Sequence, residues 1–246
     1  MTRLAALLSA SIRQALPVRR TIVFAVLQIA PTVIYLIATS NRTAEAALRG
    51  VVEIGVGTHF ALVLPVVSMV IAAGALGNER RDMTMSFITL RPIPRRSIAA
   101  TKLLAAFMAA GVLNLIGASI LGITHAIRYG GGGIIVGLAL GALVATAAYV
   151  SLFVPIGFLT DRAVVAGMAY LLVFENGVAF AVSGLAFLSP WRLGAATLGA
   201  VAEETWIYLD STAASLTMGR TVTALVVYVV ISVAFTSMLL NSRDLA

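Results

Sequence analysis

Six long apolar runs, separated by short polar segments, dominate the pattern of residues along the chain. A helix needs about 20 mostly apolar residues to cross the hydrocarbon core of a membrane. The pattern therefore predicts an all-α membrane protein, a single domain over residues 1–246 with six transmembrane helices. The predicted spans are Thr21–Thr39, Ile54–Leu76, Leu103–His125, Ile134–Leu159, Ala163–Leu188 and Val222–Leu240.

Two segments outside the spans carry weaker helical patterns. A helix over residues 1–19 would have one apolar face, formed by Leu4, Leu7, Leu8, Ile12 and Leu16. This pattern predicts an amphipathic helix on the membrane surface, with the start of a cleaved signal peptide as the alternative. In the outer segment, residues 189–220, the apolar run Leu193–Ala202 is too short to span. Short re-entrant or outer helices before the sixth span are predicted there, with an ordered surface loop as the alternative.

Composition supports a membrane protein and removes several function classes. Of the 246 residues, 60% are hydrophobic and 11% are charged, whereas a soluble domain has about 25% charged residues. The chain contains no cysteine, which excludes disulfides and thiolate metal sites. The net charge of +7 does not indicate nucleic-acid binding, because the basic residues follow the loops between the spans. A single lysine and abundant alanine indicate a bacterial source.

The distribution of basic residues predicts the orientation, because cytoplasmic loops carry the excess of lysine and arginine. Twelve basic residues fall on one side and five on the other. The richer side is expected to be the cytoplasm and would hold both termini, with the protein in the bacterial inner membrane. The poorer side carries Arg42, Arg49, Arg128, Arg192 and Arg220.

Motifs for catalysis are missing from the sequence. Lys102 stands between Thr101 and Leu103, so the chain has no P-loop of the Gly-x-x-x-x-Gly-Lys-Ser/Thr type. His59 and His125 are its only histidines, and they form no His-Glu-x-x-His pattern for zinc. No serine lies in a Gly-x-Ser-x-Gly setting. The sequence predicts no catalytic residue, metal or cofactor in this chain.

A few polar and small residues within the spans are candidates for function or packing. Glu175 lies deep in the fifth span, and a carboxylate in lipid is costly enough to be a functional hypothesis by default. We weigh a substrate pathway with Asn176 against a structural brace, and a break at Asn176-Gly177 is a further possibility. Asn114 is either a pathway residue or an interhelical hydrogen-bonding residue. A stripe of small residues on the fourth span predicts close helix packing: Gly133, Gly137, Gly141 and Ala145.

The densest charge in the chain lies in residues 77–102, between the second and third spans. This segment holds eight of the 27 charged residues. Residues 82–90 can form about two helical turns before Pro92 stops them. Glu79 is expected to pair with a nearby arginine, and Arg95, Arg96 and Lys102 to hold lipid phosphates.

The order of residues in this segment resembles that in membrane subunits of ABC-type exporters of the second family (ABC-2). The shared pattern is Gly77-x-Glu79, Thr84, Leu90-Arg91-Pro92, Arg95 and Lys102, although Asn78 separates a glycine and glutamate that are often adjacent. The resemblance also includes the six-span layout, the amphipathic first helix, Glu175 and the outer segment, so it covers essentially the whole chain.

The resemblance implies that two such permeases, identical or homologous, pair in the membrane. Each would dock on a separate ATPase subunit that binds ATP and magnesium. It further implies that residues 77–102 contain a coupling helix seated in a groove of that subunit. The contacting residues would be Glu79, Asp82, Thr84, Arg91, Pro92, Arg95 and Lys102.

The apolar bundle favours a hydrophobic or amphipathic cargo, such as a lipid, drug or peptide. Two alternatives stay open. The chain could be an ATP-independent carrier or membrane assembly factor, or part of an ABC complex that transmits a conformational change without moving solute.

Overall fold

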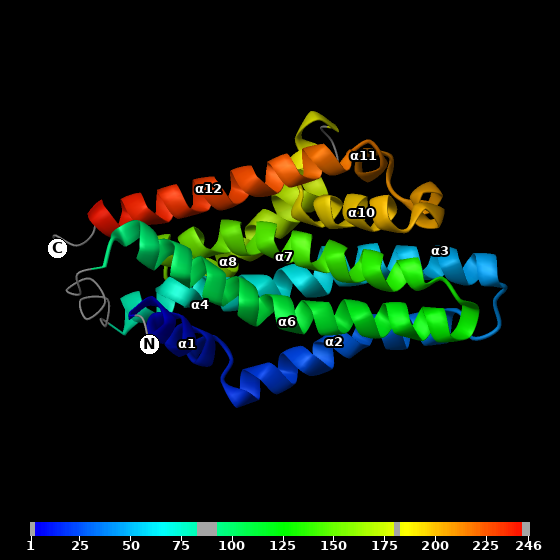
Figure 1. Ribbon diagram of the computed structural model, residues 1–246, viewed down its shortest axis with the longest axis horizontal. Coiled ribbons are helices and arrows are strands. Elements are labelled where there is room, and N and C mark those ends of the chain that lie inside the picture. Colours follow the sequence, from blue (N-terminus) through cyan, green and yellow to red (C-terminus); the bar gives the residue numbers. More distant parts are fainter. Residues whose placement is uncertain (1–2, 83–92, 180–182, 243–246) are drawn as a thin grey trace.

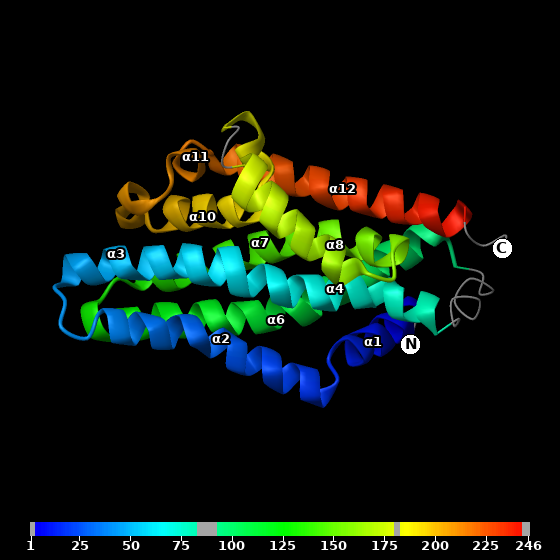
Figure 2. The same cartoon turned by 180° about the vertical axis from the view of Figure 1, so that it is seen from behind.

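The computed structural model describes residues 3–82, 93–179 and 183–242. Every regular element in these ranges is a helix, which confirms the all-α prediction. The helices run along the long axis of an elongated bundle (Figures 1 and 2). The start of α1 (Arg3–Ala15), the end of α4 (Leu64–Arg81), the start of α6 (Arg95–Tyr129) and the end of α12 (Met218–Ser242) gather at one end. We call this the charged end.

Five helices are long and apolar enough to cross a membrane. They are α2 (Val18–Ala38), the continuous helix Ala44–Arg81, α6, α7 (Gly132–Leu159) and α12. These helices coincide with five of the six predicted spans. The helix Ala44–Arg81 comprises α3 (Ala44–Ile54), the π-helix η1 (Gly55–Val63) and α4. It extends well beyond the predicted Ile54–Leu76, because α3 alternates exposed charged residues with buried Ala47, Val51 and Val52 and is therefore less apolar on average.

The fifth predicted span, Ala163–Leu188, is not one long helix in the described residues. It contains α8 (Ala163–Ala169) and the π-helix η2 (Tyr170–Val178), which together form a helix shorter than the other five. The 3-10 helix η3 (Ser183–Leu188) follows after residues 180–182. The helix η2 runs through Asn176-Gly177 and Ala179 is still helical, so the break considered at this pair is not found.

The outer segment contains three short helices: α10 (Pro190–Val201), the 3-10 helix η4 (Glu203–Tyr208) and α11 (Ser211–Ala214). Eight consecutive residues of α10, 192–199, are buried, so the alternative of a surface loop is wrong. The glycine stripe of α7 faces α10. A Cβ atom on Gly141 would lie 2.6 Å from the carbonyl oxygen of Gly194, and one on Gly137 would lie 2.8 Å from Leu198 Cδ1. The small residues thus admit this short helix into the bundle.

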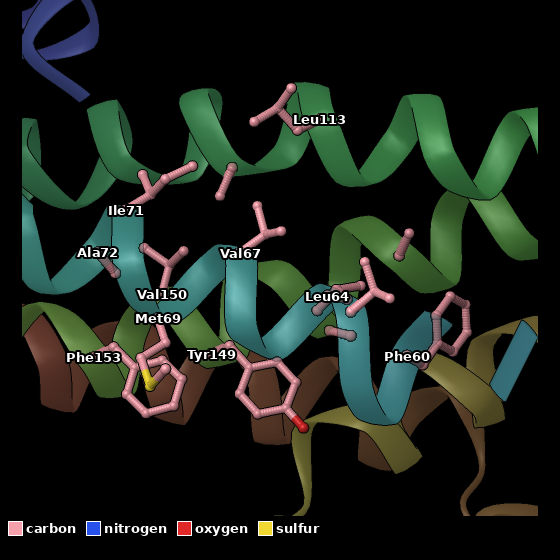
Figure 3. Packing of buried hydrophobic residues seen from close by; sticks show 14 of the residues in the cluster. Phe60, Leu64, Val67, Met69, Ile71, Ala72, Leu113, Tyr149, Val150 and Phe153 are labelled. Carbon is pink, nitrogen blue, oxygen red and sulfur yellow. The ribbon is translucent and has the colours of Figure 1, made fainter. Parts of the chain in front are cut away.

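The hydrophobic core lies where η1 and α4 pack between α6 and α7. Figure 3 shows Leu64 and Val67 of α4 between α6, which carries Leu113, and Tyr149 of α7. α7 is the central element, in contact with α4, α6, α10 and α12. The predicted amphipathic helix exists as α1, which packs against α6 and α4 at the charged end.

Candidate functional site

The charged end is built around a buried ion pair between α4 and α6. Glu79 Oε1 accepts a hydrogen bond from Lys102 Nζ, and the two residues are only 5% and 1% exposed. Lys102 is the cation in this pair, and it is too deeply buried to hold lipid phosphates, which corrects that expectation. The reason is that Lys102 lies two turns inside α6, on the face that packs against α4.

Arg80 ties the end of α4 to the turn between α7 and α8. Its Nη1 donates to the carbonyl oxygen of Phe158 at 2.6 Å, and its Nη2 forms an ion pair with Asp161. The Phe158 carbonyl belongs to the last turn of α7, where carbonyl groups lack partners within the helix. α4 is therefore fixed to α6 by Glu79 and to α7 by Arg80.

Gly77 serves packing at the same end. A Cβ atom there would lie 2.7 Å from the carbonyl oxygen of Gly157 on α7, a distance that real Cβ contacts essentially never show. The two backbones are in direct contact at this point. Gly77 therefore allows α4 and α7 to approach closely enough for Arg80 to reach the end of α7.

The remaining residues of the predicted coupling site divide into two groups. Asp82 ends α4, where its backbone N–H donates to the Asn78 carbonyl oxygen at 2.8 Å and its side chain is exposed. Arg95 opens α6. Thr84, Arg91 and Pro92 lie outside the described residues, and so does the predicted coupling helix after Asp82. The structure thus defines the two anchored helix ends from which residues 83–92 depart.

Asn114 lies at the centre of a polar network that joins four helices. Its Oδ1 accepts from Gln28 Nε2 at 2.6 Å, and its Nδ2 donates to Ser68 Oγ at 3.1 Å and to Thr146 Oγ1 at 2.9 Å. The four residues belong to α2, α4, α6 and α7 and are at most 1% exposed. Because the amide bonds in three directions to buried partners, the geometry supports interhelical bonding over a pathway role.

Both histidines also bond within the bundle. His59 Nε2 lies 3.2 Å from the Asn114 carbonyl oxygen, and His125 Nδ1 lies 2.8 Å from the Tyr35 hydroxyl. Within the ranges that the structure describes, no three histidine or acidic side chains gather as metal ligands.

Glu175 forms a second buried cluster, which joins three elements. Its Oε1 accepts from the hydroxyls of Tyr149 at 3.2 Å and Tyr170 at 3.3 Å, and its Oε2 accepts from Ser189 Oγ. These donors come from α7, from η2 and from the residue that precedes α10. Asn176 does not complete this cluster, since its Nδ2 donates to the Leu171 carbonyl oxygen at 2.9 Å. The arrangement braces η2 against α7 and the start of α10.

A groove of about 1260 Å³ lies between α7, η2 and α12. Tyr170 and Phe174 form part of its wall, while Glu175 is not among its lining residues. Of the three residues whose hydroxyls bond Glu175, Tyr170 is the one that lines the groove. The sequence did not reveal this groove, because the groove depends on how α12 is oriented relative to α7. Figure 1 shows the two helices separating toward the start of α12. The one signal in the sequence was the polar stretch of hydroxyls and Arg220 that leads into the last span.

We expect Glu175→Leu to lower the thermal stability of the protein. The buried hydroxyls of Tyr149 and Ser189 and the half-buried hydroxyl of Tyr170 lose their acceptor, and an unsatisfied buried donor costs about 1–3 kcal/mol. Glu175→Gln should lose less stability, because the amide oxygen of the glutamine still accepts a hydrogen bond and a rotated hydroxyl can accept one from its amide N–H. Unfolding temperature and transport per folded molecule would be measured together, with exposed Glu45→Gln as the control. Native stability of both Glu175 variants, or altered transport by a Glu175→Gln protein of native stability, would contradict the brace.

Comparison with models of protein families gives one match. Residues 16–182 match the model described as ABC-2 family transporter protein. The matched range is 167 of 246 residues. It includes α4, the start of α6 and Glu175, whereas α1 precedes it and α10, α11 and α12 follow it. No curated protein matches the chain.

Proposed function

Because the chain belongs to the ABC-2 transporter family, we propose that it is the permease subunit of an ATP-driven exporter. Family membership and five long apolar helices make it a multi-pass membrane protein of the ABC permease type. In our proposal two permease copies pair, and each docks on a separate ATPase subunit that binds ATP and magnesium. The complex moves a hydrophobic or amphipathic substrate out of the cytoplasm. The match favours this function over an ATP-independent carrier.

The contacts between helices at the charged end support the proposal that ATP hydrolysis by a partner is coupled to this chain. Residues 83–92 lie between α4 and α6 in the chain. The Glu79–Lys102 ion pair joins the end of α4 to the beginning of α6. Arg80 joins the same end of α4 to α7. A displacement of residues 83–92 by an ATPase would therefore move α4, α6 and α7 as one unit. Such a linkage is the mechanical requirement for coupling in a chain without its own P-loop.

The proposed topology places the charged end in the cytoplasm of a bacterial cell. The excess of basic residues at the predicted inner loops supports this orientation. Six crossings then require residues 163–188 to form the fifth, interrupted crossing. α1 would lie at the inner membrane surface, which its amphipathic pattern and its position against α6 and α4 support.

Site-directed cross-linking tests the proposed partner directly. The chain has no native cysteine, so single cysteines can be introduced without background. We expect Ser86→Cys, within residues 83–92, to cross-link to a P-loop ATPase that copurifies from native membranes and hydrolyses ATP. Ser40→Cys is the control, because Ser40 is exposed beyond the far end of α2. We also expect Arg91→Ala to uncouple ATP hydrolysis from transport.

Two results would refute the proposal. One is a chain that purifies from native membranes in active form without an ATPase. The other is equal cross-linking from Ser86→Cys and Ser40→Cys, since docking at the charged end cannot produce contact at the opposite end. An ATPase that docks at residues 83–92 without any detectable solute movement would instead support the ABC complex that transmits only a conformational change.

A further inference from the structure

We propose that the groove between α7, η2 and α12 binds an anionic membrane amphiphile, with its head group at Arg220 and its apolar tail along α12. This inference deepens the proposed function, on which it rests for the statement that such an amphiphile is the class of cargo. Binding of the amphiphile itself can be tested on the permease alone. The lining, the length and the charge of the groove support such binding.

The residues that line the groove are charged and polar at the start of α12 and mainly apolar further along it. One face of that helix, at spacings of three and four residues, supplies the wall: Arg220, Ala224, Val227, Ile231 and Phe235. Opposite them stand Leu152 and Ile156 of α7 and Phe174 of η2. These residues from Ala224 to Phe235 are apolar, and the two other lining residues of this part of α12, Tyr228 and Ser232, add hydroxyl groups. An aliphatic chain is the ligand that such a wall excludes from water most favourably.

The charge of the lining lies where α12 begins. Among the described residues that line the groove, Arg220 alone carries a full charge at neutral pH, and none of the ion pairs between described residues involves it. Thr212, Ser215, Thr217 and Thr223 add hydroxyl groups around it. The Thr217 hydroxyl accepts from the Arg220 backbone N–H at 3.4 Å, and a hydroxyl that accepts can still donate its own proton. A guanidinium among hydroxyl donors is suited to a phosphate or carboxylate.

The first turn of α12 strengthens this preference for an anion. A helix leaves its first N–H groups without partners inside the helix, and its dipole places partial positive charge at that end. Gly219 lines the groove there, and a Cβ atom on it would meet nothing within 4 Å. A head group can therefore approach the backbone of this turn as well as the Arg220 side chain.

The length of the groove fits a lipid tail. Arg220 and Phe235 are fifteen residues apart on one helix, which corresponds to about 22 Å at a rise of about 1.5 Å per residue. One leaflet contributes about 15 Å of hydrocarbon, half of the ~30 Å core. An acyl chain of the leaflet that holds the start of α12 can therefore lie fully within the apolar wall. Val227, Ile231 and Phe235 are 47%, 60% and 40% exposed, so the groove is accessible from the surrounding lipid.

Photolabelling in nanodiscs tests this binding site. The probes are phosphatidylglycerol and phosphatidylcholine carrying the same diazirine on an acyl chain, each added to discs of unlabelled phosphatidylcholine. We expect phosphatidylglycerol to label α12 and η2 preferentially, and Val227→Trp to remove most of this labelling by filling the groove. Val226→Trp is the matched control, because Val226 is exposed but is not part of the lining.

The head-group contact is tested by removing the charge. Arg220→Gln should reduce the preference for phosphatidylglycerol about fivefold, which corresponds to ~1 kcal/mol for one basic residue at a lipid surface. Arg42→Gln, at another exposed arginine, should keep the preference. Equal labelling in the two tryptophan variants, or no preference between the two lipids, would overturn the proposal. So would efficient disulfide formation between copies through Val227→Cys, since a second subunit would then fill the groove. None of these outcomes bears on docking of an ATPase at residues 83–92, so the two proposals fail separately.

Discussion

Lys102→Met is expected to destabilise the protein far more than the simultaneous removal of both charges of the Glu79–Lys102 pair. Both residues are buried, so the single change removes the ammonium group that the Glu79 carboxylate bonds. Breaking a buried pair in this way costs about 3–5 kcal/mol, whereas replacing both partners by neutral groups is often nearly neutral. The double variant Glu79→Gln with Lys102→Met should therefore recover most of the lost stability. Reversible unfolding of the four proteins in detergent, analysed as a double-mutant cycle, measures the coupling.

Arg49 and Glu53 provide the matched control for this cycle. They also form an ion pair between a basic and an acidic side chain, at 2.7 Å, but their side chains are 66% and 54% exposed. An exposed pair four residues apart on a helix contributes about 0.3–0.5 kcal/mol. Equal coupling energies for the two pairs would show that burial at the charged end has no energetic consequence. A double variant as unstable as the sum of its single variants would lead to the same conclusion.

The same cycle separates folding from ATP coupling. In our proposal the Glu79–Lys102 pair joins the two helices that flank residues 83–92. A double variant that folds but lacks the pair should keep the ATPase bound while its hydrolysis responds less to the transported substrate. A fully coupled complex of the double variant would limit the pair to a structural role.

Long-range hydropathy predicted most of the fold, because five spans are continuous apolar helices that any sliding window detects. It failed where tertiary packing decides the structure. The described helix Ala163–Val178 covers only the first part of the predicted Ala163–Leu188, and Ser183–Leu188 form a 3-10 helix instead. Similarly, α10 combines apolar residues with a buried arginine, Arg192, which the sequence placed in a loop.

Arg192 shows why partners of charged residues could not be predicted from sequence. Its Nε donates to Asp210 at 2.8 Å, and its guanidinium lies 4.4 Å from the centre of a Trp191 ring. Burial alone raises the pKa of Asp210, but the bonds from Arg192 and the Thr212 N–H outweigh it, so the pKa is lowered. These contacts join residues eighteen positions apart across three short helices. Likewise, Glu79 meets Lys102 across a segment of more than twenty residues, so no local spacing identified that pair.

The glycine stripe was visible in the sequence, but its partner was not. A repeat of small residues every four positions predicts that some helix approaches closely. It does not say that the helix is α10, which is too short to span. The position where the two backbones meet is Gly141 with Gly194, and both glycines also contact the ring of Phe60. The stripe thus holds the outer segment to the core and, through Ser189 at the start of α10, supports the cluster around Glu175.

Gly141→Val is therefore expected to have the second largest effect on stability. A Cβ atom at this position would lie 2.6 Å from the Gly194 carbonyl oxygen and 2.9 Å from the Phe60 ring. Backbone cannot move aside as a flexible side chain can, so α10 must shift away from α7. Overpacking of this kind costs about 1–3 kcal/mol and occasionally more. The measurement is the free energy of unfolding in detergent, together with protease resistance of the outer segment.

Gly133→Ala is the matched control on the same stripe of α7. A Cβ atom there would have its nearest neighbours at 3.7–3.8 Å, which is ordinary van der Waals contact. Replacing a helical glycine by alanine favours the helix by up to about 1 kcal/mol, so this variant should be as stable as the parent protein or more stable. If Gly141→Val and Gly133→Ala change stability equally, α10 does not pack on the stripe as described. If only Gly141→Val destabilises and the outer segment becomes protease-sensitive, close backbone contact between α7 and α10 holds that segment in place.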